Sequence, residues 1–177
     1  MKLGAKQLRV TRPSEEELAK IKRKPIYIVL DNVMDTYNIG SIFRLADATA
    51  AREVILCGGS ECPPSSRIHK AAVGTETWVP WRYAPKVGEV IKRLRGEGVK
   101  IIAVEQDPRA TLIFDIQYSR FNRGPVAIVV GHETEGVSKE VLDMADVIVE
   151  IPMWGVNKSL NVVVSAAVVL YKLVGEK

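Results

Sequence analysis

The sequence predicts an α/β domain built on a mostly parallel sheet with helices on both faces. Short apolar runs such as IYIVL, EVILC and VAIVV alternate along the chain with segments of helical periodicity. The runs are apolar throughout, which is typical of parallel strands buried on both faces. The chain has 177 residues, 47% of them hydrophobic, which suffices for one well-packed domain. We expect a short flank at residues 1–24 and one domain at 25–177.

Each element has its own local signal. Ser14 and Glu17 form a capping pattern that predicts a peripheral helix over residues 15–22. Beyond Pro25, β-branched and aromatic runs predict strands, and amphipathic segments closed by Gly or begun by Ser predict helices. The expected strands are 26–30, 53–58, 78–83, 99–106, 125–131 and 146–152, and the expected helices are 39–51, 67–73, 87–98, 138–145 and 160–174.

Composition narrows the class of protein. The formal charge of +4 and the pI near 9.1 favour an anionic partner such as nucleic acid. Two cysteines and two histidines make a metal cage improbable, so we expect no metal and reduced thiols. No apolar segment reaches the length of a membrane span, and the first residues have no signal-peptide pattern, so we expect a cytoplasmic protein without a membrane partner.

Common enzyme signatures are missing from the sequence. No G-x-G-x-x-G follows a strand, GGSECPPSS lacks the Lys-Ser/Thr ending of a phosphate-binding loop, and no G-x-S-x-G elbow occurs. Dinucleotide-dependent dehydrogenases, P-loop enzymes and serine hydrolases are therefore set aside.

Ligands of open α/β sheets bind beyond the carboxyl ends of the strands, so polar residues there are informative. In DNVMDTYNIGSIFRLADA, Asn38, Gly40 and Arg44 open the first helix of the domain. The helix dipole disfavours a cation near its N-terminus, so Arg44 in that place would suit a bound phosphate. The alternative is a solvated charge or an ion pair with a nearby aspartate, for which Asp31, Asp35 and Asp47 are the candidates.

Two further strand ends carry polar residues. In GHETEGVS, Gly131 and Gly136 permit close backbone approach beside Glu133, although the loop could merely cap the next helix through Ser138 with Glu133 solvated. In IPMWGVNKSLN, Ser159 is a candidate cap for the last helix, which leaves Asn161 unexplained in its first turn. A buried polar group needs a partner, and a ligand would provide one.

Together the three stretches resemble the motifs of the SpoU (TrmH) family of RNA 2′-O-ribose methyltransferases, within the SPOUT superfamily. The first motif is present in the pattern N-x-G-x-I-x-R-x-A, the second as VVGHETEGVS and the third as IPMWGVNKSLNVVVSAA, in order from Asn38 to Ala167. The resemblance implies a SPOUT-type fold whose C-terminal segment forms a deep trefoil knot. It also implies S-adenosylmethionine as the methyl donor, with a cofactor pocket that includes Val104, Gly131, Ile151, Met153, Ser159 and Leu160.

Carried over by position, the resemblance places catalytic roles on five residues and RNA contacts on three. The catalytic set is Asn38, Arg44, Glu133, Ser159 and Asn161, and the RNA-binding set is Arg44, Arg67 and Lys70. It further implies a homodimer and an RNA substrate, for which transfer RNA is preferred over ribosomal RNA. The sequence departs from the family pattern at His132, where Asn or Ser is usual, and at Val164, where Ser is common.

The expected reaction is an in-line displacement at the methyl group by a ribose 2′-hydroxyl. The donor is already activated, so the protein must chiefly orient the hydroxyl and help to remove its proton. We expect Arg44 to bind the phosphate beside the target ribose, with the proton passing to that phosphate or to water, because a guanidinium stays protonated. Two other classes remain open, a noncatalytic RNA-binding module and a SPOUT enzyme that methylates a base nitrogen.

Overall fold

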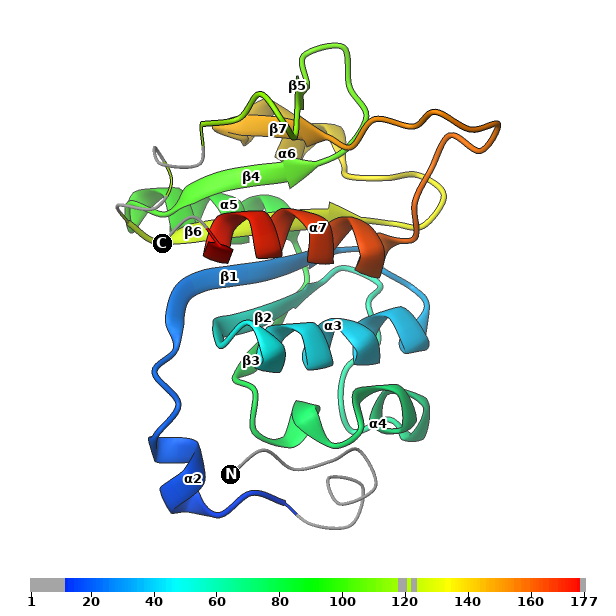
Figure 1. The fold of residues 1–177 in the computed structure, drawn as a ribbon. Coiled ribbons are helices and arrows are strands. Elements are labelled where there is room, and N and C mark those ends of the chain that lie inside the picture. The colour runs from blue at the N-terminus through cyan, green and yellow to red at the C-terminus, as the bar shows by residue number, and fades with distance from the viewer. Residues whose placement is uncertain (1–11, 118–120, 122–123, 176–177) are drawn as a thin grey trace.

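The computed structural model describes residues 12–117, 121 and 124–175, and its centre is a seven-stranded sheet in the order β3-β2-β1-β6-β4-β7-β5 (Figure 1). Every strand pair in this sheet is parallel, which confirms the predicted class. The strands are β1 (Lys24–Asp31), β2 (Ala51–Cys57), β3 (Trp81–Ala84), β4 (Lys100–Val104), β5 (Thr111–Leu112), β6 (Val126–Gly131) and β7 (Val147–Glu150).

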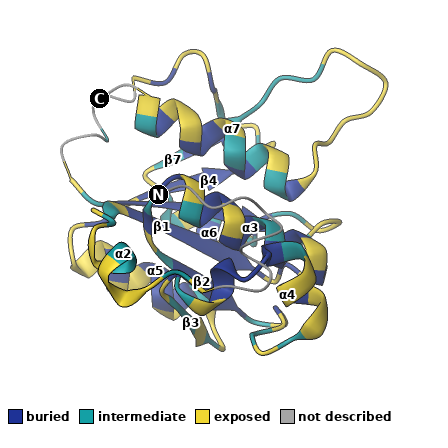
Figure 2. Ribbon diagram, turned by 60° about the horizontal axis from the view of Figure 1, so that its bottom comes forward, coloured by how far each residue is buried: buried dark blue, intermediate teal, exposed yellow. Residues whose placement is uncertain are grey.

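Helices cover both faces of the sheet, as the apolar strands predicted. Along β1, Ile28 and Leu30 enter one apolar cluster while Tyr27 and Val29 enter the other, because side chains alternate across a strand. Figure 2 shows the buried strands lying between these two layers. The first layer contains α3 (Thr36–Ala48), α4 (Ser66–Ala72) and α7 (Val162–Gly175), and the second contains α5 (Val87–Gly96) and α6 (Lys139–Met144).

The peripheral helix of the flank forms, but it is shorter than predicted. Helix α2 spans Glu15–Ala19 instead of 15–22, and the predicted capping box between Ser14 and Glu17 is present. None of its residues is buried, so packing does not extend it beyond its cap. Residues 1–11 of the predicted flank lie outside the described residues.

Other element boundaries move because of capping groups that the sequence pattern did not reveal. Helix α3 begins three residues early, since the Asp35 carboxylate accepts a hydrogen bond from the Tyr37 N–H. A 3₁₀ turn at Thr75–Thr77 and the two-residue strand β5 were not expected, because neither is long enough to show a period. Within the described ranges, no helix is sufficiently long and apolar to cross a membrane.

Gly40 explains how α3 and α4 come so close together. A Cβ at this position would lie 2.6 Å from the Ala71 Cβ and 2.6 Å from the Ile68 carbonyl oxygen, so only glycine fits the crossing. The motif glycine therefore has a packing role, and it sets the basic helix α4 against the helix that carries Arg44.

Candidate functional site

A cavity of about 450 Å³ opens where β4, β6 and β7 end and α7 begins. Its volume is in the range of small-molecule sites, and its position is the one expected for a parallel sheet. Apolar side chains and backbone of the strand ends form one side, and the loop at 151–161 forms the other. All six residues predicted for the cofactor line it, namely Val104, Gly131, Ile151, Met153, Ser159 and Leu160.

A chain of hydrogen bonds joins the three motifs beside this cavity. The Asn38 side-chain amide donates to the Glu133 carboxylate at 2.9 Å, and the Asn161 amide donates to the Asn38 carbonyl oxygen at 3.0 Å. Asn38 is buried, whereas Glu133 and Asn161 line the cavity. Three of the five predicted catalytic residues, far apart in sequence, are thus directly connected.

The Glu133 carboxylate is held at the end of the strand and is not merely solvated. It also accepts the backbone N–H groups of Met34 at 3.1 Å and Asp35 at 3.0 Å. Burial raises the pKa of Glu133, but the hydrogen bonds from Asn38, Met34 and Asp35 outweigh it and hold the pKa below its ordinary value. Glu133 is therefore an anion at neutral pH that fastens the second motif to the first.

Ser159 does not cap the last helix, contrary to the expectation. Helix α7 begins at Val162, and the Asn161 side-chain oxygen accepts the Val163 N–H at 2.9 Å. Asn161 thus caps α7 with its oxygen and binds Asn38 with its amide, which accounts for a polar residue at this position. Ser159 lies two residues earlier in the exposed loop, where its N–H donates to Asn157.

The prediction that Arg44 lies near a helix N-terminus was wrong. Arg44 is the ninth residue of α3 and is exposed. The proposed ion pairs do not form either, because each aspartate has another partner: Asp31 accepts the Ser138 N–H, Asp35 caps α3 and Asp47 accepts the indole N–H of Trp78. Within the part of the chain that the structure describes, Arg44 makes no ion pair.

The loop after β6 is a tight turn that only glycine permits at its start. A Cβ on Gly131 would lie 2.1 Å from the carbonyl carbon and oxygen of Gly136, and Gly136 itself has a φ of +72°. Two backbone hydrogen bonds between His132 and Gly136 close the turn. The His132 ring nitrogen Nδ1 accepts the N–H groups of Thr134 and Glu135, a role that a short Asn or Ser side chain also fills in turns. His132 thus keeps the turn despite departing from the motif.

The two other predicted RNA-binding residues, Arg67 and Lys70, lie on α4 and outside the cavity lining. Both side chains are exposed. Because Gly40 lets α4 pack closely on α3, these residues belong to the same layer as Arg44.

Ser138, the other predicted cap, does precede α6, but its hydroxyl does not cap the helix.

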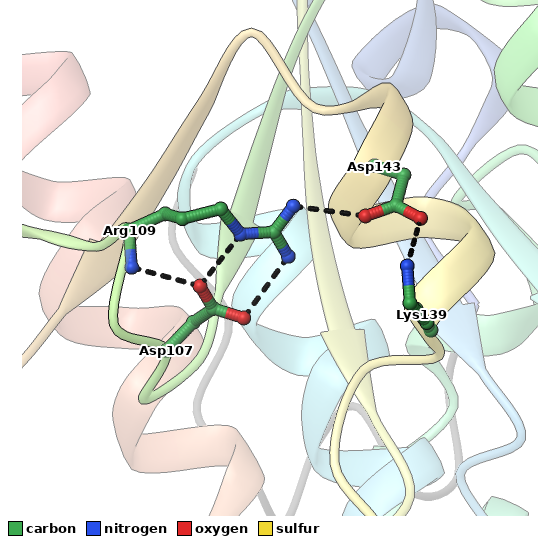
Figure 3. A network of polar contacts seen from close by, with 4 residues as sticks. All are labelled: Asp107, Arg109, Lys139 and Asp143. Atoms are coloured by element: carbon green, nitrogen blue, oxygen red, sulfur yellow. Dashed lines mark hydrogen bonds and ion pairs between the residues drawn. The ribbon is translucent and has the colours of Figure 1, made fainter.

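Sequence reasoning missed one wall of the cavity, which the segment after β4 supplies. Glu105 and Gln106 line it, and the Gln106 amide donates to the Lys158 carbonyl oxygen across the rim. The signal was present, since an acid directly follows an apolar run at a strand end. Arg109 then fastens this segment to α6 by binding Asp143, as Figure 3 shows. Asp107 holds Arg109 from within the segment, and Lys139 binds Asp143 within α6.

The comparisons with known proteins bear on this arrangement. The model of the SpoU rRNA Methylase family matches residues 25–171. The chain belongs to this family. Apart from Lys24 at the start of β1, its match includes the whole sheet and the three polar stretches around the cavity. The family assignment suggested by the motifs is confirmed.

Individual relatives agree with this membership. A 23S rRNA (guanosine-2′-O-)-methyltransferase of Ralstonia nicotianae is 31% identical over 92% of this chain. The tRNA (guanosine(18)-2′-O)-methyltransferase of Escherichia coli K12 is 32% identical over 85% of it. This SpoU-family chain spans 64% of the length of each of these two relatives.

A solved structure shows the same fold. The AdoMet-bound rRNA methyltransferase from Sinorhizobium meliloti superposes with a TM-score of 0.79 at 28% identity, over 96% of this chain and 60% of that one. The SPOUT-type α/β architecture predicted from the sequence is therefore confirmed for this member of the SpoU family.

Proposed function

We propose that this protein transfers a methyl group from S-adenosylmethionine to a ribose 2′-hydroxyl in structured RNA. The observation that carries the proposal is the hydrogen-bonded chain Glu133–Asn38–Asn161 at the edge of the 450 Å³ cavity. It joins polar residues of all three motifs beside a space that suits a small molecule. A noncatalytic RNA-binding module would need neither the cavity nor this network.

The residues that line the cavity fit S-adenosylmethionine. Val104, Ile151 and Leu160 offer an apolar surface for an adenine ring, and Gly131 keeps the strand end free of a side chain. Carboxylates of the lining suit a ligand that carries positive charge. When bound, the cofactor supplies an activated methyl group, so the protein needs no metal for this chemistry. Met153 and Ser159 complete the proposed binding set from the loop at 151–161.

The protein's own part in the reaction is to place the ribose. Arg44 is free to bind the phosphate next to the target nucleotide, because none of its neighbouring aspartates holds it. The 2′-hydroxyl then bonds to the methyl carbon as the carbon–sulfur bond breaks, and its proton passes to that phosphate or to water. In this scheme Asn38 and Glu133 are positioning residues, since their polar atoms are engaged with each other. Asn161 is a third positioning residue, because its amide binds Asn38 and its oxygen accepts the Val163 N–H. Ser159 lines the cavity and is placed to contact the ribose.

We assign the RNA-facing surface to α3 and α4. Arg67 and Lys70 lie three residues apart on one side of α4 and are exposed, so they can meet successive phosphates. Transfer RNA is the proposed substrate class. Ribosomal RNA is the second candidate, because the Ralstonia relative is named as a 23S rRNA enzyme.

The proposed assembly is a homodimer that uses α7. Val164, Val168 and Tyr171 recur at helical spacing and form an exposed apolar stripe on this helix, with exposed fractions of 46%, 40% and 55%. A second copy would cover this stripe.

We also propose the C-terminal trefoil knot, supported by the packing of α7 back onto α3 and β6 after the loop at 151–161. Free Cys57 and Cys62 agree with a cytoplasmic location.

The deciding experiment incubates the protein with isotopically labelled S-adenosylmethionine and separate tRNA and rRNA pools, followed by mass spectrometry of the nuclease-digested RNA. We expect labelled 2′-O-methylnucleoside from tRNA. Arg44→Ala should lower the yield by about 100-fold, because misplacing the reacting hydroxyl has an effect of this order. Affinity for S-adenosylhomocysteine should stay within a few fold, since Arg44 does not line the cavity.

Arg93→Ala is the matched control, because Arg93 is an exposed cation on α5, in the opposite layer of the fold. It should leave the yield unchanged. A labelled base without labelled ribose would instead identify a base-nitrogen methyltransferase. Label in rRNA alone would select the second substrate class, and a collapse of cofactor affinity in folded Arg44→Ala would contradict its assignment to the RNA side.

A further inference from the structure

Glu105 occupies a position at the cavity that the motifs do not cover. It follows Val104 directly, at the carboxyl end of β4, and lines the cavity beside apolar residues. No lysine, arginine or histidine among the described residues forms an ion pair with it. A half-buried carboxylate without a cation beside an apolar wall requires hydrogen-bond donors to stabilise it.

The protein supplies only some of the hydrogen bonds that the Glu105 carboxylate can accept. One oxygen of Glu105 accepts the Val137 N–H at 2.8 Å, and the other accepts the Gln106 N–H at 2.9 Å. An ionised carboxylate has about four acceptor sites, so about two remain for a ligand. Glu133 differs, because its two oxygens take three donors from the protein.

The direction of the Glu105 side chain is fixed by the turn that faces it, and the chain that follows it is anchored too. The Gly136–Val137 turn lies against it, since a Cβ on Gly136 would be 2.2 Å from its Oε2 atom. The following residues are anchored as well: Arg109 binds Asp107 through two nitrogens and reaches Asp143 at 2.8 Å (Figure 3). A carboxylate held in this way needs little reordering to receive a ligand.

We propose that Glu105 binds the vicinal hydroxyls of the cofactor ribose. This inference rests on the proposed function and names a residue for one part of its ligand. A vicinal diol carries two O–H donors on adjacent carbons, which matches the two open acceptor sites of one carboxylate. The same chemistry recurs in dinucleotide-binding α/β folds, where an acid near a strand end accepts the ribose hydroxyls. The apolar residues next to Glu105 then face the adenine.

The test is a thermodynamic cycle that combines one substitution in the protein with one change in the ligand and compares the four binding affinities. Isothermal titration calorimetry measures S-adenosylhomocysteine and its 2′,3′-dideoxy analogue against the wild-type chain and Glu105→Gln. Glutamine keeps an oxygen for the Val137 N–H but loses the charge and one acceptor. We expect Glu105→Gln to weaken the binding of S-adenosylhomocysteine by about tenfold or more. The affinity for the dideoxy analogue should not change, because that ligand has no ribose hydroxyls to donate to Glu105.

The matched control is Glu140→Gln, which removes a carboxylate charge from exposed α6 outside the cavity and should leave both affinities unchanged. Equal weakening of both ligands by Glu105→Gln would show that Glu105 only holds the turn, and would overturn the inference. Unchanged affinity for S-adenosylhomocysteine would overturn it too. If the wild-type chain fails to bind S-adenosylhomocysteine, the proposed function and the inference are both refuted. If the wild-type chain binds it and folded Glu105→Gln binds it equally tightly, only the inference is refuted.

Discussion

Asn38→Ala should destabilise the fold as well as the site, because one side chain joins the first motif to the other two. It removes a donor from the ionised Glu133 and an acceptor from Asn161. A hydrogen bond to a charged group contributes about 1.5–3 kcal/mol and a neutral one about 1 kcal/mol. Water can reach Glu133 and Asn161, which are exposed, so we expect a net loss of about 1–2 kcal/mol in the free energy of unfolding.

The assay is urea unfolding of wild type, Asn38→Ala and Asn157→Ala at pH 7 and at pH values below 4.5. Asn157 is the control, an exposed amide whose only described side-chain bond is to the Ser159 N–H. The pKa of Glu133 is lowered in the folded protein from an ordinary 4.5, so the stabilisation it provides is complete above that pH and is lost as the pH falls through the folded value.

The difference between wild type and Asn38→Ala should therefore shrink on acidification. A loss below about 0.3 kcal/mol at pH 7, or a difference independent of pH, would refute the reasoning about this network, because a hydrogen bond to an ionised carboxylate contributes several times that amount.

Three further results are expected. Gly131→Ala should weaken S-adenosylhomocysteine by at least about tenfold in calorimetry, because the new Cβ would collide with the Gly136 backbone at the cavity; unchanged binding would contradict this. The Arg109 side chain lowers the pKa of Asp107 from 3.8 to about 2, so the gap in melting temperature between wild type and Asp107→Asn should be full above pH 4 and close as the pH falls toward 2; a constant gap would show that the charge is irrelevant. RNA affinity should fall with rising salt, with a shallower slope for Arg44→Ala, and equal slopes would argue against a phosphate contact.

The local pattern was sufficient for the sheet, and the family resemblance named six residues that line the cavity, although the wall formed by Glu105 and Gln106 was missed. The apolar runs identified six of the seven strands, since strands buried on both faces leave a continuous hydrophobic signal. The rule that ligands bind at strand ends led to the segments around Asn38, Glu133 and Asn161, which the structure brings together. Helix starts were less accurate, because Asp35 and Asn161 cap through side-chain bonds that periodicity does not register.

The tertiary structure decided which polar residues form hydrogen bonds with one another. The sequence by itself determined the fold class, the basic character and the three polar strand ends, because these depend on residue type and spacing alone. It could not show that Asn38 connects Glu133 with Asn161, since those residues lie 95 and 123 positions from Asn38 and meet it only when β6 pairs with β1 and α7 packs against α3. Nor could it show that Glu105 faces the cavity while the aspartates near Arg44 are occupied elsewhere. Hydrogen bonds act over about 3 Å, so the partners of these groups are set by the packing of distant segments.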